Sequence, residues 1–184
     1  MAAVTSHTVL PTGTWVVDPD HTTIEFRVKH IGLARVRGVF HRFEGVLEVG
    51  HDGRVSASGT VDAASLDTRV AARDEHLRSA DFFDVERHPR LAFAATAIEP
   101  VAEDRLRIVG DLTIRGVTRS IELTAEVLGT GIDDEGATRI GLDIAGTLDR
   151  RDFGLTWNSV VDGGGMLVGN RVDLRLEVSA LRRA

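Results

Sequence analysis

The stretch TTIEFRVKH, residues 22–30, alternates apolar and charged side chains. Ile24, Phe26 and Val28 share one side of an extended chain, and the residues between them are charged. Successive side chains of a β-strand point to opposite faces. The alternation therefore predicts a strand with one buried and one solvated face.

The same period of two recurs along most of the chain. It predicts about eight strands, at residues 22–30, 42–49, 54–62, 90–98, 105–114, 119–128, 138–148 and 172–180. Short turn sequences such as GHDG (50–53) and RGVT (115–118) separate neighbouring strands. Such short connections imply antiparallel pairing.

Residues 64–89 interrupt the strand pattern. There Asp67 or Thr68 is a candidate N-cap for a helix that runs to about Ala80. The His88-Pro89 pair then returns the chain to an extended conformation. One short helix is thus expected between the third and fourth strands.

Eight strands with one apolar face each can pack as a sandwich or close into a barrel. Closure removes the strand edges that otherwise need protection, and Lys29 is the only lysine available to protect one. We therefore favour an all-β, eight-stranded antiparallel barrel. A chain of 184 residues suits one domain, which we assign to residues 14–184 after an N-terminal extension, 1–13.

Three of the predicted strands carry a glycine among the apolar residues of their inward face. These are Gly59, Gly110 and Gly146. A barrel of eight strands is just wide enough to be filled by side chains or to hold one small ligand, so the missing volume favours a lumen. Glycines that mark bulges or bends would instead serve only curvature. The sequence leaves both interpretations open.

The composition bounds the class of partner. The formal net charge is −6, and the 22 basic residues are scattered, which argues against a nucleic-acid-binding face. The chain has no cysteine, so disulfides, thiolate zinc sites and thiol nucleophiles are excluded. No secretory signal or membrane-spanning stretch is apparent, and we expect a cytoplasmic protein.

Four segments together resemble a known family. They are TWVVDPDHTTIEFRVKH (14–30), RDEHLRSADFFDVERHP (73–89), GDLTIRGVTRSIEL (110–123) and RRDFGLTW (150–157). In order and relative position they resemble the YceI-like family of lipocalin-like polyisoprenoid-binding proteins, from about Thr14 to Ser179. The resemblance implies a lipocalin-like barrel, often a homodimer, whose apolar tunnel holds a long isoprenoid or fatty chain. It also implies no established catalytic activity and no cofactor beyond the bound lipid. Many members carry a secretory signal, which this sequence lacks.

RDEHLRSADFFD, residues 73–84, concentrates the ionisable groups of the chain. On a helix Asp74 and Arg78 are neighbours one turn apart, and Arg73 shares a face with His76. An enzyme using His76 and Asp74 as acid and base is one interpretation. We favour a polar clasp instead, with Asp74 and Arg78 paired on the surface, because the chain shows no nucleophile elbow, phosphate loop or dinucleotide motif.

The histidines give only a weak indication of a metal site. His21, His30 and His76 could converge in space, but no His-x-x-x-His spacing supports a metal ion, and we expect none. Hydrogen bonding to loops is the more common role. In DPDH (18–21) we expect turn-forming side chains that bond backbone amides.

The aromatic residues suit a tunnel wall. Phe26, Phe43 and Phe93 lie at inward positions of strands, whereas Phe40 and the remaining aromatics are expected in connections at the mouth. The expected lumen and mouth residues are Phe26, Val28, Phe40, Phe43, Phe82, Phe83, Phe93, Leu112, Leu142, Ile144, Phe153 and Trp157. A polar clasp at the mouth is expected to comprise His21, His30, Arg73, Asp74 and His76. The glycine-rich segment 156–172 is a candidate flap, a plain hairpin or a dimer contact.

The sequence thus predicts a non-catalytic carrier. Its ligand would be one long apolar chain, such as a polyisoprenoid, an isoprenoid quinone or a fatty-acid derivative, held in the lumen. The alternatives are an enzyme acting on a lipophilic substrate and a filled barrel that serves as an interaction module.

Overall fold

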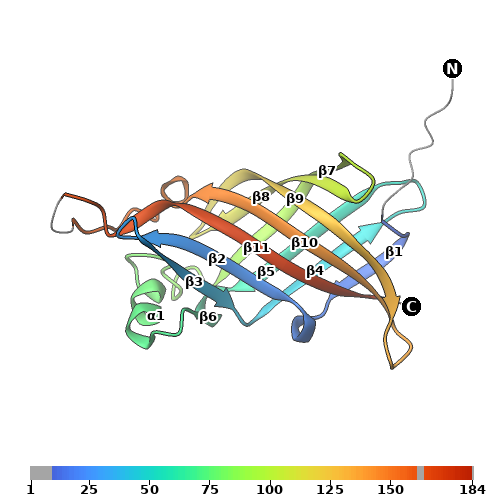
Figure 1. The fold of residues 1–184 in the computed structure, drawn as a ribbon, viewed down its shortest axis with the longest axis horizontal. Coiled ribbons are helices and arrows are strands. Elements are labelled where there is room, and N and C mark those ends of the chain that lie inside the picture. The colour runs from blue at the N-terminus through green and yellow to red at the C-terminus, as the bar shows by residue number, and fades with distance from the viewer. Residues whose placement is uncertain (1–9, 161–163, 184) are drawn as a thin grey trace, which may run out of the picture.

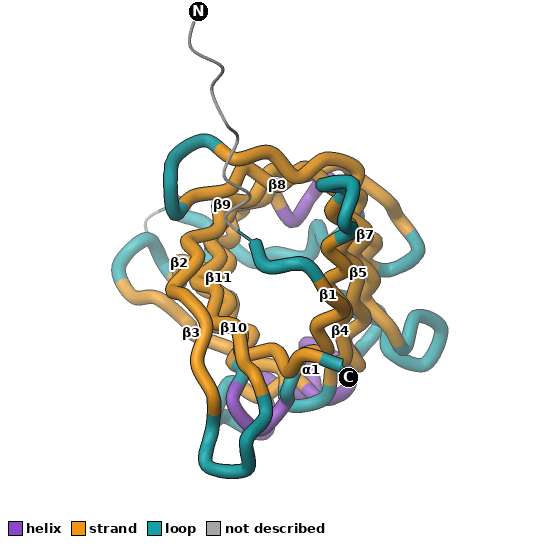
Figure 2. The backbone as a smooth tube through the Cα atoms, turned by 90° about the vertical axis from the view of Figure 1, so that its right-hand side faces the viewer, coloured by secondary structure: helices purple, strands orange, loops and turns teal. Residues whose placement is uncertain are grey.

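The computed structural model describes residues 10–160 and 164–183, and it is a closed eight-stranded antiparallel barrel (Figure 1). Figure 2, which looks along the barrel, shows the strands arranged in a ring. The strand segments are β1 (Gly13–Val17), β2 (Thr23–His30), β3 (Ala34–Phe40), β4 (Phe43–Val49), β5 (Val55–Asp62), β6 (Leu66–Asp67), β7 (Arg90–Pro100), β8 (Arg105–Ile114), β9 (Val117–Ile132), β10 (Thr138–Asp149) and β11 (Val168–Arg182). The helices are α1 (Ala71–Arg78) and three short 3-10 turns, η1 (Pro19–His21), η2 (Ala63–Ser65) and η3 (Arg150–Phe153).

Three of the barrel strands are each broken into two segments. The segments β1 and β2 form one barrel strand, because both pair with β11 and their partners β4 and β3 follow each other along the chain. In the same way β3 and β4 form a second strand, and β5 and β6 a third. The predicted barrel of eight strands is therefore confirmed.

Short polar turns cause two of the breaks. At η1 the side chain of Asp18 accepts a hydrogen bond from the backbone N–H of Asp20, and Pro19 lies between them. At η2 the side chain of Asp62 accepts from the backbone N–H of Ala64. An aspartate that bonds the backbone two residues ahead makes a turn, which bends the strand without ending its ladder.

The alternation that predicts the strands is visible in their burial. In β9 the side chains of Leu123 and Ala125 are buried while Glu122, Thr124 and Glu126 between them are exposed. The quoted stretch departs from this rule at one position. Glu25 is buried although it belongs to the outer face, because Arg27 and Arg37 both form ion pairs with it.

The packed core lies at the β1 end of the barrel. Trp15 and Ile140 are fully buried there, with Leu10, Val49 and Ala180 packed around them. The indole N–H of Trp15 donates to the carbonyl of Pro11, which satisfies its one polar group. Two smaller clusters, around Phe40 and around Phe153, pack at the α1 end.

The strand prediction missed the segments β1, β3 and β6. Each is short or lies next to a turn, so its alternation covers too few residues to be distinguished from a loop. As a consequence Phe40, expected in a connection, is the last residue of β3.

The helix begins later than predicted. Its first residue is Ala71, and neither Asp67 nor Thr68 caps it. Asp67 ends β6 and accepts a hydrogen bond from the backbone N–H of Arg69, whose φ of 65° turns the chain before the helix starts. No helix in residues 10–160 and 164–183 is long and apolar enough to cross a membrane.

Neighbouring groups occupy the space that a side chain would take at each inward glycine. A Cβ at Gly110 would lie 2.3 Å from Cζ of Phe93, and one at Gly146 would lie 2.3 Å from Cδ2 of Leu123. Gly59 lies against the backbone of Glu44. At Gly110 and Gly146 the space is thus taken by a packed side chain rather than left as lumen, and any lumen must come from elsewhere.

Candidate functional site

Two apolar cavities occupy the barrel. One of about 370 Å³ lies at the α1 end and one of about 250 Å³ lies in the centre. They share six lining residues: Phe26, Phe40, Leu91, Ile114, Leu148 and Leu174. The two cavities therefore adjoin, and together, as what we call the tunnel, they reach the size range in which proteins hold small apolar ligands.

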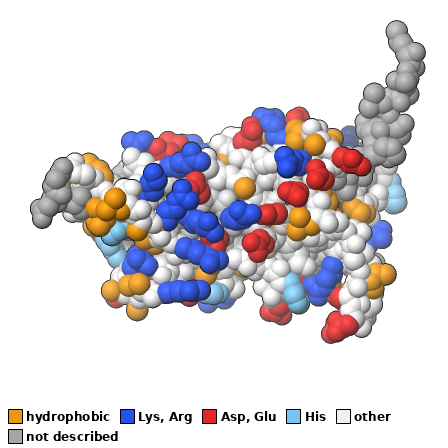
Figure 3. Space-filling view, viewed as in Figure 1, with side chains coloured by type: hydrophobic (Ala, Val, Ile, Leu, Met, Phe, Trp, Pro, Cys, Tyr) orange, Lys and Arg blue, Asp and Glu red, His pale blue; other side chains and the backbone are white. Residues whose placement is uncertain are grey.

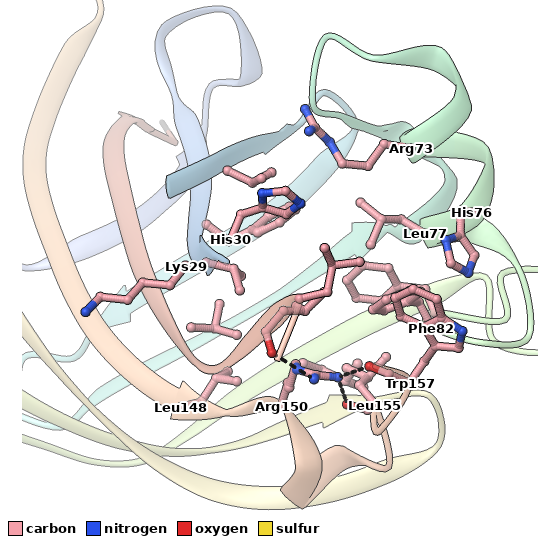
Figure 4. Close-up of a pocket in the computed structure, with 18 of the residues that line it drawn as sticks. Lys29, His30, Arg73, His76, Leu77, Phe82, Leu148, Arg150, Leu155 and Trp157 are labelled. Carbon is pink, nitrogen blue, oxygen red and sulfur yellow. Dashed lines mark hydrogen bonds between the residues drawn. The ribbon is translucent and has the colours of Figure 1, made fainter. Parts of the chain in front are cut away.

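The end cavity is built from elements far apart in the sequence (Figure 4). Its strand walls come from β2, β3 and β11, which contribute Val28, Val36 and Val172. Helix α1 and the turn after it contribute Leu77, Phe82 and Phe83, while Leu155 and Trp157 come from the connection after η3. A polar rim of His30, Arg73 and His76 interrupts this apolar wall, and Lys29 lies beside it with its amine pointing away from the cavity (Figure 4).

Three rings pack together on the α1 side of the cavity. The ring of His76 meets Trp157 edge-on at 4.6 Å between centroids and Phe82 at 5.1 Å. Phe82 and Trp157 are 5.4 Å apart. Nε2 of His76 lies 2.9 Å from Oδ2 of Asp81, so the imidazole is held at the rim by a carboxylate and by two aromatic neighbours.

Arg150 is a buried cation at the base of the end cavity. Its guanidinium has five N–H donors, and each has an acceptor. The acceptors are the carbonyls of Leu155, Trp157, Val168 and Gly169 and the side-chain oxygen of Asn170. Arg150 therefore joins the connection after η3 to the start of β11, and Figure 4 shows it between these segments.

The electrostatics of this end follow from the same residue. Burial lowers the pKa of Arg150 from its ordinary value, yet an arginine stays charged in proteins. The neighbouring Asp149 pairs with Arg151 instead of Arg150, and hydrogen bonds from Arg151 lower the pKa of Asp149 to about 2. The end cavity thus has a positive charge at its base, balanced chiefly by backbone dipoles.

Asp74 is a buried structural acceptor rather than a surface partner of Arg78. Its Oδ1 accepts from the backbone N–H of Thr68 at 2.8 Å and from the Thr68 hydroxyl at 2.5 Å. Arg78 instead donates to the carbonyls of Ala64 and Leu66. The expected Asp74–Arg78 pair is therefore wrong, because the chain before α1 folds back over the helix and offers closer partners.

Replacing Asp74 by alanine is expected to lower the free energy of unfolding by about 2 kcal/mol, because the amide and hydroxyl of Thr68 lose their buried acceptor. Urea denaturation followed by circular dichroism measures the change. The matched control is Glu75→Ala on the exposed side of the same helix, which should leave the midpoint unchanged. Equal midpoints for the two variants would contradict the assignment.

Most of the expected site residues line the tunnel. The residues that line the end cavity include Phe26, Val28, Phe40, Phe82, Phe83 and Trp157, with His30, Arg73 and His76 at its rim. The residues that line the central cavity include Phe26, Phe40, Phe43, Phe93, Leu112, Leu142 and Ile144. Phe82 and Phe83 therefore face the cavity as well as the packing beneath the helix.

Three expected residues lie outside both cavities. Phe153 is buried against Ile114 and Leu155 in a cluster behind the cavity wall. Asp74 faces Thr68. His21 lies at the η1 kink and bonds Asp18, which also binds Arg139. Local sequence cannot separate these positions from mouth positions, because the kinks that displace them arise only when the barrel closes.

The most important residue that the sequence analysis missed is Arg150. It stands in the charged run DRRD (149–152), where an arginine is usually solvated. Its only distinguishing signal is its place directly after a long strand and before the buried Phe153. Apolar residues such as Leu77, Leu91 and Leu155 were missed for a different reason, since they lie in connections or at strand ends.

In residues 10–160 and 164–183 no three metal-ligating side chains come together as a metal site would require. The glycine-rich segment 156–172, a candidate flap, hairpin or dimer contact, is described only in part, because residues 161–163 lie outside the described residues. Around that gap Val160 and Met166 form an antiparallel bridge, which is the geometry of a hairpin.

The sequence profile of the YceI-like domain matches residues 15–180. The chain belongs to the YceI-like family. A UPF0312 protein of Pectobacterium carotovorum is 38% identical over 138 residues, which cover 74% of this chain and 71% of the relative. A UPF0312 protein of Staphylococcus aureus is 30% identical over 166 residues, which cover 89% of this chain and 93% of the relative. The resemblance found in the sequence is thus confirmed.

Three solved structures share the fold. The YceI protein of Campylobacter jejuni superposes with a TM-score of 0.73 at 28% identity, over 85% of this chain and 90% of that one. BcnA of Burkholderia cenocepacia gives 0.77 at 21% identity, over 89% and 98% of the two chains. A polyisoprenoid-binding domain of Saccharophagus degradans gives 0.67 at 13% identity, over 94% and 100%. At such identities the last two show a common fold.

Proposed function

We propose that this YceI-like protein binds one long apolar chain, such as an isoprenoid or an acyl lipid, in its tunnel and performs no chemistry on it. The observation that carries the proposal is the pair of adjoining apolar cavities, of about 370 and 250 Å³, inside a closed barrel. The polyisoprenoid-binding domain of Saccharophagus degradans, which shares the fold, supports the ligand class.

Affinity would come from the hydrophobic effect. Each methylene moved from water into an apolar lumen contributes about 0.8 kcal/mol, so ten buried carbons contribute about 8 kcal/mol before ordering costs. An extended prenyl or acyl chain fits a tunnel of two adjoining cavities.

The head group would stay at the α1 end. The rim there offers N–H donors from His30, Arg73 and His76, and the charge of Arg150 lies beneath them. These groups favour a head that accepts hydrogen bonds, such as an alcohol, a carboxylate or a phosphate. The rival enzyme would need Asp74 beside His76, whereas Asp74 is bound to Thr68 and His76 is bound to Asp81.

Organic extraction of the purified protein is expected to yield stoichiometric prenyl or acyl lipid, with the matching mass difference in native mass spectrometry. For protein stripped of lipid, geranylgeraniol should shift the fluorescence of Trp157 to shorter wavelength, because the lipid would exclude water from the end cavity that this ring lines. Trp157→Phe is the control, because it leaves only the buried Trp15 to report. Protein that is isolated empty and binds neither geranylgeraniol nor palmitate would rule the proposal out.

A further inference from the structure

The outer face of the β2–β3 hairpin concentrates positive charge. Lys29 pairs with Arg35 across the two strands, and Arg27 pairs with Arg37. Like charges placed directly opposite each other on a sheet destabilise it. Arg27 and Arg37 share the carboxylate of Glu25, whereas neither Lys29 nor Arg35 forms an ion pair within the described part of the chain. This hairpin carries an unfavourable excess of cations in a protein whose net charge is −6.

The turn of the same hairpin exposes apolar side chains. Leu33 is 90% exposed and Ile31 is 44% exposed. Ile31 and Gly32 both have positive φ, 55° and 70°, in a tight turn closed by a hydrogen bond from Leu33 N–H to the carbonyl of His30. Such turns favour asparagine or glycine, and a β-branched residue is strained there. An isoleucine at this position is costly to the isolated fold, which points to a use for its side chain.

The apolar turn adjoins the mouth of the end cavity. The backbone N–H of Ile31 donates to the carbonyl of Leu167, and Leu167, Lys29 and His30 all line that cavity. Met166, the neighbour of Leu167, is also exposed. At about 3.3 Å per residue, the Lys29–Arg35 pair stands roughly 7 Å behind the tip of the turn. That spacing places apolar groups at the acyl boundary of a bilayer and cations among its head groups.

The opposite end of the barrel has the apolar groups without the cations. Ile132 is 75% exposed at the β9–β10 turn, but Asp133, Asp134 and Glu135 follow it directly. Figure 3 shows the same contrast, with basic side chains gathered over β2, β3 and β11 and acidic ones more frequent toward the other end. Leu33 therefore lies beside cations that have no acidic partner among the described residues, whereas Ile132 lies beside three acidic residues.

We propose that the β2–β3 turn docks this protein on an anionic lipid bilayer, with Ile31 and Leu33 inserted and Lys29 and Arg35 at the lipid phosphates. The inference rests on the proposed function for its purpose, since docking would bring the mouth of the tunnel to the lipid. It adds to that function the kind of surface from which the chain is exchanged.

Flotation with phosphatidylcholine vesicles that contain about 30% phosphatidylglycerol tests the docking. The unaltered protein is expected to bind these vesicles and to bind pure phosphatidylcholine at least tenfold more weakly. Leu33→Glu should reduce binding more than tenfold. Lys29→Ala combined with Arg35→Ala should reduce it about 25-fold, at about fivefold for each cation. Ile132→Glu is the matched control and should bind like the unaltered protein, because it carries the same substitution at the acidic end.

Geranylgeraniol added from ethanol separates this inference from the proposed function. Leu33→Glu should take up that lipid as the unaltered protein does, because Leu33 does not line the tunnel. Normal uptake together with no vesicle binding by the unaltered protein would overturn docking and leave the proposed function standing. Vesicle binding without uptake of geranylgeraniol would support docking and overturn the proposed function. Light scattering tests whether a second copy of the chain occupies this face instead. If the unaltered protein is a dimer that Leu33→Glu dissociates, and it binds no vesicles, the face is a dimer contact and docking is overturned.

Discussion

Replacing Arg150 by methionine is expected to lower the free energy of unfolding by about 4 kcal/mol. The loss comes from the acceptors that the guanidinium leaves behind. Three backbone carbonyls, from Leu155, Trp157 and Gly169, lose their donor at a site with little access to water, whereas the carbonyl of Val168 keeps the side-chain amide of Asn158. A lysine at this position keeps the charge but has only three donors, so its variant should lose less stability than the methionine variant.

Urea denaturation monitored by circular dichroism measures both variants. The control is Arg151→Met, which makes the same substitution one residue later, where the guanidinium is exposed and bound to Asp149. Its midpoint should stay close to that of the unaltered protein. A methionine variant at position 150 as stable as this control would show that the carbonyls find water, and that Arg150 does not hold the end cavity together.

Replacing Ala57 by phenylalanine is expected to weaken the binding of a long prenyl chain about 50-fold. Ala57 lies on β5 and lines the central cavity, toward the β1 end of the barrel. A phenyl ring there would displace about three methylenes of the ligand, worth about 2.4 kcal/mol. The ring would enter unfilled space, so the fold should retain its stability.

Chain length makes this test specific. Geranylgeraniol should lose affinity in the Ala57→Phe variant, whereas the shorter farnesol should bind almost unchanged if the end cavity holds it. Ser56→Phe is the matched control, because its side chain is on the exposed face of the same strand. Fluorescence titration of both alcohols against the three proteins gives the comparison. Equal affinities for geranylgeraniol would show that the chain does not reach the central cavity.

The barrel could be predicted from sequence because its signal is local. In β9, for example, every second residue from Ile121 to Val127 is apolar, and the intervening residues are charged or polar. Inward positions such as Phe93, Leu112 and Leu142 followed from the same parity and do line the central cavity. Whether a side chain points inward or outward follows from the alternation within its own strand, and no other part of the chain has to be known.

What could not be predicted depends on contacts between distant segments. Asp74 looked like a surface acid, and only the fold of the chain before α1 brings Thr68 onto it. Arg150 looked solvated, and its acceptors at residues 168–170 lie nearly twenty residues away. In both cases the partners include backbone groups, and the sequence pattern carries no information about where a backbone N–H or carbonyl will point.

The packing around Trp15 has a consequence for how a chain would travel. Leu10, Trp15 and Ile140 are buried in the packing at the β1 end, so we expect a bound chain to use the mouth at the α1 end. A bound chain would enter tail first and would have to back out along the same path. Loading and unloading would then use the same opening. The protein would have to leave the lipid donor before it could deliver the chain to an acceptor, and it could not connect the two at once.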